Sequence, residues 1–523
     1  MMAMRLERKK NTIRNLVWGM SGRAVTLLGP FVIRSMIIER LGAGYLGLGS
    51  LFTSILQVLN MAELGIGSAV AYCMYAPIAN DDTEVICALL GAFRKIYKII
   101  GLVILGAGLL LSPFLGLLIN GDVPADINIH LLYLLYLLNA SISYLMCAYR
   151  NVLFSAFQRE DILSKIHSAL LIAGYVVQII ILSMFRDYYL YYAVVPIISI
   201  LDNTVVYFLS KEYFPRYIPQ GALPQQIKGD IKEKVSGIVI SKFCGLTRNA
   251  FDSIIISSFI GLRAVAIYGN YYYIMSNLSA LLVIGVTAMR AGIGNSIAMD
   301  TEEKNHKDIG RFSFIYMWVA GWCSICLLCL YQPFMELWVH KENMFPFYMV
   351  ILFSVYFFGL CVGDIIDAYS GAVGLWWENR KRTMCEAVCN LLLNIVLGYL
   401  FGVAGVLLAT VITIFVFNFF WKAYILYDRY FVSYRFFGHI RINMFYMVVT
   451  IMAGAVSLTL CAMVDLKPIY ALFFRGVVCV FVPNLIFFLA YGRLSVYKDA
   501  ERFIKTLFGR RRKRDRWEDD MPI

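Results

Sequence analysis

The sequence predicts an all-α polytopic membrane protein with about fourteen transmembrane helices, and three observations support this fold class. The 523 residues are 60% hydrophobic and 15% charged, with a mean hydropathy of +0.70, unlike the composition of a soluble domain. Apolar stretches of about 20 residues, each long enough to cross a bilayer, follow one another from Leu16 to Tyr491. The short polar segments between them alternate between many basic residues and few.

The elements follow in order from these stretches. A basic segment, Arg5 to Arg14, precedes the first span without a small-residue cleavage site, so we expect a retained helix rather than a signal peptide. The fourteen spans are expected at 16–38, 46–72, 97–119, 129–149, 163–185, 189–210, 236–260, 264–298, 312–338, 347–375, 384–400, 403–421, 442–463 and 469–492. We expect two six-helix lobes at 1–210 and 236–428, a linker at 211–235, two more helices within 429–493 and a basic tail at 494–523.

The 47 Lys and Arg residues fall mainly on one side of this topology. Both termini and alternate loops hold 36 of them, the opposite loops hold five, and six lie inside spans. Because basic loops remain in the cytoplasm, we expect a multi-pass protein with both termini cytoplasmic. The net charge of +13 then reflects topology rather than nucleic-acid binding. The basic run at 510–514 is expected to contact anionic membrane lipids.

A faint internal repeat, at an offset of about 219 residues, relates the two lobes. Gly42 aligns with Gly261, and Arg23 aligns with Lys242. Six helices are an even number, so the lobes would have the same orientation. Parallel repeats of this kind are related by an axis along the membrane normal, and a transport path between them is expected.

Three sets of motifs carry a resemblance to a known family. They are Leu64-Gly-Ile-Gly67 through Tyr75-Ala-Pro-Ile-Ala79 with Asp81-Asp82, Tyr268-Gly-Asn-Tyr-Tyr-Tyr273, and Gly374-Leu-Trp-Trp followed by Glu386, Asn390, Asn394, Gly402-Val-Ala-Gly405-Val and Thr410. Their order, with the chain length and span count, resembles the Wzx-type oligosaccharide flippases of the multidrug/oligosaccharidyl-lipid/polysaccharide exporter superfamily. The resemblance implies export of undecaprenyl-pyrophosphate-linked oligosaccharide repeat units by alternating access, in a bacterial inner membrane. It also suggests polysaccharide polymerase and glycosyltransferases as partners.

Five of the six cationic residues inside spans are the candidate substrate-binding residues, because an unpaired cation at membrane depth is costly and a pyrophosphate carries negative charge and many acceptor oxygens. They are Arg23, Arg34, Lys242, Arg248 and Arg290. Arg23 and Arg34, eleven residues apart, share one helix face. The alternatives are snorkelling for Arg34 and, for Arg248, an i,i+4 pair with Asp252.

Polar residues in the eighth span are candidate sugar contacts, and acidic residues at depth are candidates for coupling to H⁺ or Na⁺. The sugar candidates are Asn270, Tyr271 and Asn277, and helix packing is the alternative role for each. The coupling candidates are Asp364, Asp367, Glu63 and Asp252. Asp364 and Asp367 lie one turn apart, where two carboxylates in a partly dry site would share a proton. The alternative role for these acids is hydrogen bonding to hydroxyls or pairing with a basic residue.

The motifs leave several functional classes to weigh. The sequence has no Walker A motif, metal triad or nucleophile motif, so we expect no enzyme activity, no metal and no cofactor. A flippase for the peptidoglycan precursor lipid II fits the length and span count equally well. An ion-coupled small-molecule antiporter of the same fold would favour an acidic cavity, and a membrane-embedded polymerase would need a long external loop.

Overall fold

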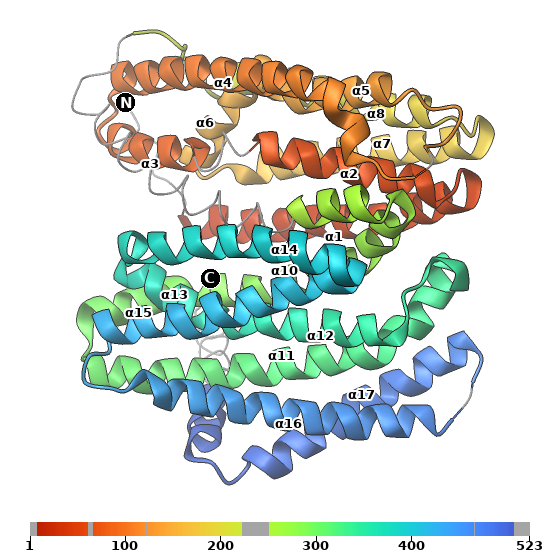
Figure 1. The fold of residues 1–523 in the computed structure, drawn as a ribbon. Coiled ribbons are helices and arrows are strands. Elements are labelled where there is room, and N and C mark those ends of the chain that lie inside the picture. The colour runs from red at the N-terminus through yellow and green to blue at the C-terminus, as the bar shows by residue number, and fades with distance from the viewer. Residues whose placement is uncertain (1–7, 61–65, 122, 222–249, 465, 507–523) are drawn as a thin grey trace, which may run out of the picture. The chain divides into compact units, whose positions relative to one another are not determined.

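The structure, a computed structural model, describes residues 8–60, 66–121, 123–221, 250–464 and 466–506. These residues form helices and connecting turns, and no strand occurs among them (Figure 1). A bilayer favours this outcome because a helix satisfies its backbone hydrogen bonds internally. The predicted all-α fold class is therefore confirmed.

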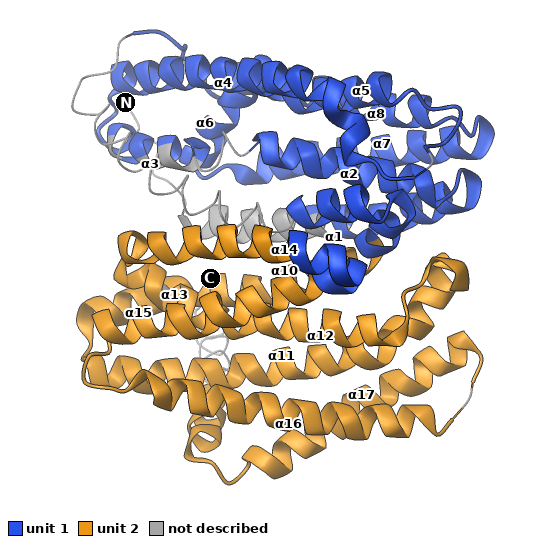
Figure 2. Ribbon diagram, viewed as in Figure 1, with its two compact units in different colours: residues 1–269, 394–406 blue, residues 270–393, 407–523 orange. Residues whose placement is uncertain are grey.

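Two compact units make up the described chain, residues 1–269 with 394–406 and residues 270–393 with 407–523 (Figure 2). The helices that begin in unit 1 are α1 (Arg8–Arg40), α2 (Ala43–Leu59), α3 (Ile66–Ala79), α4 (Thr83–Leu111), η2 (Ser112–Leu118), α5 (Ile129–Leu145), η3 (Ala148–Arg150), α6 (Asn151–Ala156), α7 (Glu160–Met184), α8 (Tyr188–Tyr213), the helix Ala250–Phe259 and α10 (Leu262–Met299). Those that begin in unit 2 are α11 (Glu302–Val339), η4 (Lys341–Asn343), α12 (Phe347–Val362), α13 (Asp364–Val373), α14 (Trp376–Thr413), η5 (Ile414–Trp421), α15 (Lys422–Arg429), α16 (Phe436–Ala462) and α17 (Pro468–Tyr491). The helices α10 and α14 contribute residues to both units.

Every one of the fourteen expected spans overlaps a described helix. Nine described helices are long and apolar enough to cross a membrane, and one bent pair, Ile129–Leu145 with Ala148–Ala156, passes the same test together. The stretch Trp376–Arg429 contains two expected spans, because α14 is interrupted at Gly402, where φ is 61° and ψ is −141°. A Cβ on Gly405 would lie 1.9 Å from the Leu397 carbonyl oxygen, so this tight reversal requires glycine.

The first compact unit extends beyond the predicted linker at 211–235, because the helix Ala250–Phe259 belongs to it. The Asn120 backbone N–H donates to the Ser257 carbonyl oxygen at 3.1 Å, and its side-chain amide donates to the Phe259 carbonyl oxygen at 3.1 Å. The start of α10 also meets α2 closely, since a Cβ on Gly47 would lie 1.9 Å from the Leu262 carbonyl oxygen. The division into six-helix lobes remains a prediction.

Side chains are distributed as expected for a membrane protein. Large apolar residues such as Leu110 (76%) and Phe473 (78%) are highly exposed, whereas polar residues such as Asn394 and Asp252 are 0% exposed. A lipid solvent favours this arrangement, in which apolar side chains lie on the outside and hydrogen-bonded polar groups lie inside. The chain is therefore a multi-pass membrane protein.

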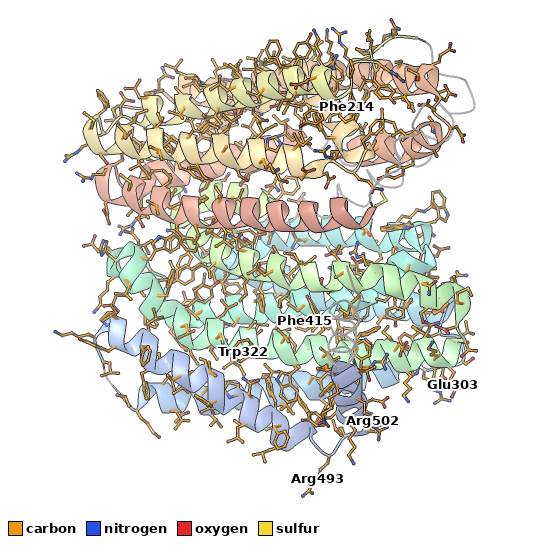
Figure 3. The ribbon with its side chains drawn as sticks, turned by 180° about the vertical axis from the view of Figure 1, so that it is seen from behind. Phe214, Glu303, Trp322, Phe415, Arg493 and Arg502 are labelled. Carbon is orange, nitrogen blue, oxygen red and sulfur yellow. The ribbon has the colours of Figure 1, made fainter. Side chains whose placement is uncertain are left out.

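In unit 2, α11 packs against α12, α16 and α17. The indole N–H of Trp322, labelled in Figure 3, donates to the Cys479 carbonyl oxygen of α17 at 2.8 Å. The segment predicted as a basic tail begins with a helix at 495–506. This helix contacts α11, where Lys307 pairs with Asp499 at 3.2 Å and the Arg311 guanidinium lies 4.3 Å from the Phe503 ring centroid.

Candidate functional site

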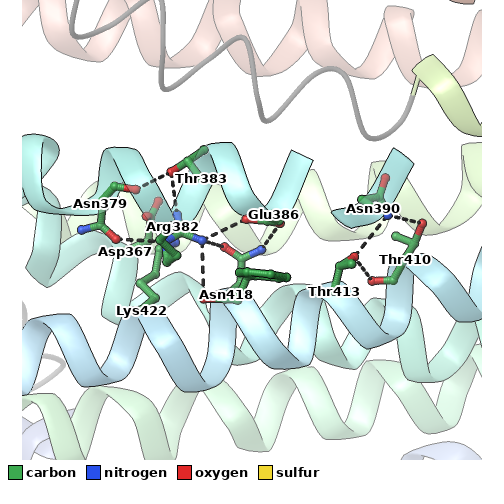
Figure 4. Close-up of polar contacts among 11 residues, drawn as sticks. Asp367, Asn379, Arg382, Thr383, Glu386, Asn390, Thr410, Thr413, Asn418 and Lys422 are labelled. Atoms are coloured by element: carbon green, nitrogen blue, oxygen red, sulfur yellow. Dashed lines mark hydrogen bonds and ion pairs between the residues drawn. The ribbon is translucent and has the colours of Figure 1, made fainter. Parts of the chain in front are cut away.

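A network of charged and amide side chains lies among the helices of unit 2 (Figure 4). It draws on α10, α13, α14, η5 and α15, and its charged members are Arg290, Asp367, Arg382, Glu386 and Lys422. Such residues are rare within apolar helices, where they mark transport paths, relays or structural pairs. The network is therefore the best described candidate site in this unit.

The first part of the network centres on Asp367 of α13. Lys422 Nζ donates to Asp367 Oδ1 at 2.6 Å, and the Lys422 side chain is 10% exposed. Arg290 Nη2 lies 3.8 Å from Asp367 Oδ2, and both of those side chains are about half exposed (49% and 50%). Asp367 thus neutralises the buried lysine closely and the arginine loosely, so the Arg290 guanidinium retains donors for another anion.

The second part is a buried ion pair within α14. Arg382 Nη1 lies 2.9 Å from Glu386 Oε2, one helical turn away, and the two side chains are 6% and 10% exposed. Asn418 of η5 joins both partners, since its Oδ1 accepts from Arg382 Nη1 at 2.8 Å and its Nδ2 donates to Glu386 Oε1. The amide therefore connects the pair to the facing helix.

Local backbone features bring these groups together. Gly363 separates α12 from α13, so Asp364 and Asp367 fall in the first turn of a new helix, where exposed N–H groups favour carboxylates. A Cβ on Gly363 would lie 3.3 Å from the Asn418 carbonyl oxygen, so glycine permits the close approach. The residues Ile414–Trp421 form a π-helix, an irregularity often found at functional sites, and Asn418 lies within it.

The two predicted coupling carboxylates of α13 have different partners. The Tyr316 hydroxyl of α11 donates to Asp364 Oδ2 at 2.5 Å, whereas Asp367 pairs with Lys422 and Arg290. The hydrogen bonds and ion pairs of the described residues therefore hold the two carboxylates separately. Asp367 is charge-compensated, whereas Asp364 accepts a hydrogen bond from a neutral hydroxyl.

A second buried acid lies in unit 1. Asp252 is 0% exposed; its Oδ1 accepts from Asn394 Nδ2 at 2.7 Å, and its Oδ2 accepts from the Tyr268 hydroxyl at 2.9 Å. Hydrogen bonds to both oxygens satisfy a carboxylate in a dry site. The remaining coupling candidate, Glu63, lies outside the described residues.

The predicted substrate cations are only partly described. Lys242 and Arg248 lie outside the described residues, and Arg23 lies on α1 with its side chain outside them. Arg34 is half-buried on α1, with its Nη2 atom 2.9 Å from the position that a Cβ on Gly269 would take. Only Arg34 and Arg290 of the five candidates therefore have described side chains. The cationic cavity remains a prediction.

The candidate sugar contacts of α10 are largely engaged with the protein. Tyr271 is 0% exposed, and its hydroxyl donates to Gln332 Oε1 at 3.2 Å and accepts from the Phe345 backbone N–H at 3.3 Å. Asn270 is also 0% exposed. Asn277 is half-buried and donates to the Tyr273 carbonyl oxygen at 2.8 Å. In this conformation Tyr271 has a packing role, because its ring and hydroxyl are both enclosed.

Sequence reasoning placed Arg382 and Lys422 in cytoplasmic loops and did not consider them as site residues. The structure places both on helices, 5% and 8% exposed. One signal was present in the sequence, because Arg382 and Glu386 are four residues apart on a helix. No local signal marked Lys422, whose partner Asp367 comes from a different helix, α13. Among the described residues, no group of three or more His, Cys, Asp or Glu side chains is arranged to hold a metal ion.

Comparison with known proteins places this geometry in a wider context. No protein-family model matches the sequence, and no curated protein matches it. A solved structure of the lipid II flippase MurJ, in an inward closed conformation, superposes with a TM-score of 0.62 at 13% identity, covering 92% of this chain and 99% of that chain. The chain therefore shares the fold of this solved flippase structure.

Solved MATE transporters have this fold as well. An inward-facing multidrug resistance MATE transporter has a TM-score of 0.57 at 15% identity, and it covers 78% of this chain and 97% of its own. A mutant of the Vibrio cholerae MATE transporter VcmN has a TM-score of 0.52 at 15% identity, with coverage of 82% and 98%. At these identities the likeness concerns the fold alone, and the neighbours are transporters and flippases.

Proposed function

We propose that the chain is a flippase that exports undecaprenyl-pyrophosphate-linked oligosaccharide repeat units across a bacterial cytoplasmic membrane by alternating access. Glycosyltransferases of surface polysaccharide synthesis would make the substrate, and a polymerase would use it after export. The protein itself acts as a transporter rather than an enzyme, with both termini in the cytoplasm. The family resemblance of its motifs motivates the choice of cargo.

The observation that carries the proposal is the placement of cations inside apolar spans. Arg290 is half exposed on α10, and its ion pair among the described residues is the long 3.8 Å contact with Asp367. A pyrophosphate oxygen would make a shorter, charge-assisted hydrogen bond than this one. Arg23, Arg34, Lys242 and Arg248 remain predicted substrate contacts from their positions in the first and seventh spans.

Coverage supports a lipid cargo over a small-molecule antiporter. The MurJ structure covers 92% of this chain, whereas the two MATE structures cover 78% and 82%. The helices α16 and α17 extend the packing around α11. The similarity to MurJ supports lipid II as the second candidate cargo, since lipid II also carries a pyrophosphate on a long isoprenoid.

Energy for export is expected from an ion gradient. Asp252 is the leading residue for H⁺ or Na⁺ coupling, because it is a fully buried carboxylate that lies beside the polar groups of Asn394 and Tyr268. Asp364, which accepts from a neutral tyrosine hydroxyl, is the next candidate. Glu63 remains a prediction from its position in the second span.

The test is transport by the purified chain in proteoliposomes loaded with undecaprenyl-pyrophosphate oligosaccharide, lipid II or a cationic dye. Arrival of each lipid cargo in the outer leaflet is followed with a lectin or antibiotic that cannot cross the membrane. We expect the oligosaccharide lipid to flip faster than in protein-free vesicles. Preferential flipping of lipid II would favour the second candidate, and dye efflux alone would favour an antiporter.

A matched pair of variants tests whether Arg290 contacts the substrate. Arg290→Gln should lower the flipping rate at least tenfold, whereas Lys381→Gln, which removes an exposed charge from α14, should not. Loss of one charge-assisted hydrogen bond corresponds to about 1.5–3 kcal/mol, which is roughly a tenfold to hundredfold change in binding. Equal rates for the two variants would argue against a substrate contact at Arg290.

A further inference from the structure

A basic pocket of about 760 Å³ lies in unit 1, and none of the candidate site residues discussed above lines it. It is formed where α4, η3, α8 and the segment after α8 meet. Four cationic side chains line it, and its lining contains no Asp or Glu. The cationic residues are Arg94, Lys98, Arg150 and Lys211. We call this the α4–α8 pocket.

Arg150 is the key residue because it is a buried cation. It is 5% exposed, its Nη1 donates to Ser210 Oγ at 2.9 Å, and its Nε donates to the Tyr149 hydroxyl at 3.4 Å. No carboxylate within the described residues pairs with it. Burying an unneutralised charge is unfavourable, and two hydrogen bonds to neutral hydroxyls leave most of its five N–H donors for an anion.

Three of the cations make cation–π contacts with two tyrosine rings, Tyr149 and Tyr207. The Arg150 guanidinium carbon lies 5.8 Å from the centroid of Tyr149 and 5.0 Å from that of Tyr207. The Arg94 guanidinium carbon lies 5.9 Å from the first centroid, and Lys211 Nζ lies 4.5 Å from the second. The rings attract each cation, but they do not cancel the repulsion between like charges brought this close.

Lys98 of α4 is the fourth cation in the pocket lining. Phe214, labelled in Figure 3, and Tyr217 of the segment after α8 also line the pocket. An anion of phosphate size would meet several donors from three separate elements there. The pocket is therefore built for negative charge.

The surroundings favour a lipid as the source of that charge. On α4, Lys98 is followed directly by Ile99, which is 61% exposed, and one turn later by Leu102, which is 60% exposed. On α8, the exposed Phe208 (64%) lies beside Tyr207. Apolar surface of this kind faces acyl chains in a bilayer, and basic pockets between transmembrane helices on the cytoplasmic side suit phospholipid headgroups.

We propose that the α4–α8 pocket binds the phosphate of an anionic phospholipid from the leaflet that the charge distribution predicts to be cytoplasmic. The headgroup phosphate accepts hydrogen bonds from Arg150 and from the exposed cations, and the acyl chains follow the apolar face of α4. Bound lipid would neutralise the buried arginine and connect α4, η3 and α8. The proposal is independent of the cargo that the protein exports.

The test uses the full-length chain in detergent, titrated with phosphatidylglycerol or phosphatidylcholine and examined by native mass spectrometry. A triple variant removes the exposed pocket cations, namely Arg94→Gln, Lys98→Gln and Lys211→Gln. A matched control removes three exposed cations outside the pocket, namely Lys95→Gln, Lys381→Gln and Arg441→Gln. All substitutions are at exposed positions, so folding is retained, and gel filtration checks this.

We expect phosphatidylglycerol to bind the wild type and the control alike and to bind the triple variant at least tenfold more weakly. Arg150→Gln should show the largest loss. Equal binding by triple variant and control, or equal binding of phosphatidylcholine, would overturn the proposal. Displacement by inorganic phosphate at the same concentration would reassign the pocket to a soluble anion, and displacement by undecaprenyl pyrophosphate would reassign it to the cargo; either result also overturns it.

Discussion

The buried pair between Arg382 and Glu386 offers a quantitative test of the network in unit 2. We consider Glu386→Gln, which preserves the shape of the side chain but removes its charge. Arg382 would then remain 5% exposed with hydrogen bonds to neutral groups, including Asn418 Oδ1 at 2.8 Å. An arginine cannot lose its proton to relieve this situation, so the folded state must accommodate a cation that has lost its carboxylate partner.

The structure sets the size of the effect. At a separation of 2.9 Å and an effective dielectric constant of ~20, the direct attraction is roughly 6 kcal/mol, most of which offsets desolvation. Removing one partner of a buried pair costs about 3–5 kcal/mol, because the other charge stays buried. Asn418 remains as a partial acceptor, so we expect a value of about 3 kcal/mol. For a unit of this size that corresponds to a fall in Tm of about 6–12 °C.

Thermal unfolding of the purified protein in detergent, followed by fluorescence-detected gel filtration, measures this change. The control is Glu501→Gln, because Glu501 and Lys505 form an exposed pair in the helix at 495–506, where no measurable change is expected. Adding Arg382→Gln to Glu386→Gln should restore much of the lost stability, since neither charge of this pair then remains buried. Equal Tm values for the single variant and the control, or a double variant no more stable than the single one, would refute the reasoning.

Three further outcomes are expected. Gly405→Ala should lower Tm markedly, because a Cβ there would lie 1.9 Å from the Leu397 carbonyl oxygen, whereas Gly106→Ala, with open space around it, should not; similar melting curves would contradict this. Asp252→Asn should abolish the response of flipping to an imposed proton or sodium gradient while leaving membrane insertion intact. A preserved response in gradient-driven proteoliposome assays would show that Asp252 does not couple transport to the ion. A cysteine at exposed Ala125 should react with an impermeant maleimide in intact cells, and labelling only after permeabilisation would reverse the topology.

The positions of the spans were accessible from the sequence because they follow from local constraints. The bilayer sets helix length, so hydropathy locates each span without reference to its neighbours. The break between the eleventh and twelfth spans was expected after residue 400, and the chain reverses at Gly402. That expectation held because only glycine readily adopts the required positive φ, and Gly402 stands between two apolar runs.

The candidate site was harder to predict because its members come from distant helices. Asp364 and Asp367 suggested a carboxylate pair from their spacing, but Lys422 and Arg290 compensate Asp367, and Tyr316 contacts Asp364. The proximity of Tyr271 to Asn270 and Asn277 in sequence suggested a polar surface. In the structure Tyr271 is enclosed, and its hydroxyl forms hydrogen bonds with Gln332 of α11 and with the Phe345 backbone before α12.

The sequence by itself determined that this is an all-α membrane protein, since composition, span length and hydropathy depend only on each segment and the solvent around it. Tertiary structure decided which charges are compensated. Lys422 meets Asp367, whereas Arg150 meets two hydroxyls and two tyrosine rings. The physical reason is that a charge buried in a low dielectric depends on the few groups within about 4 Å of it, and those groups come from other helices whose packing no local pattern specifies.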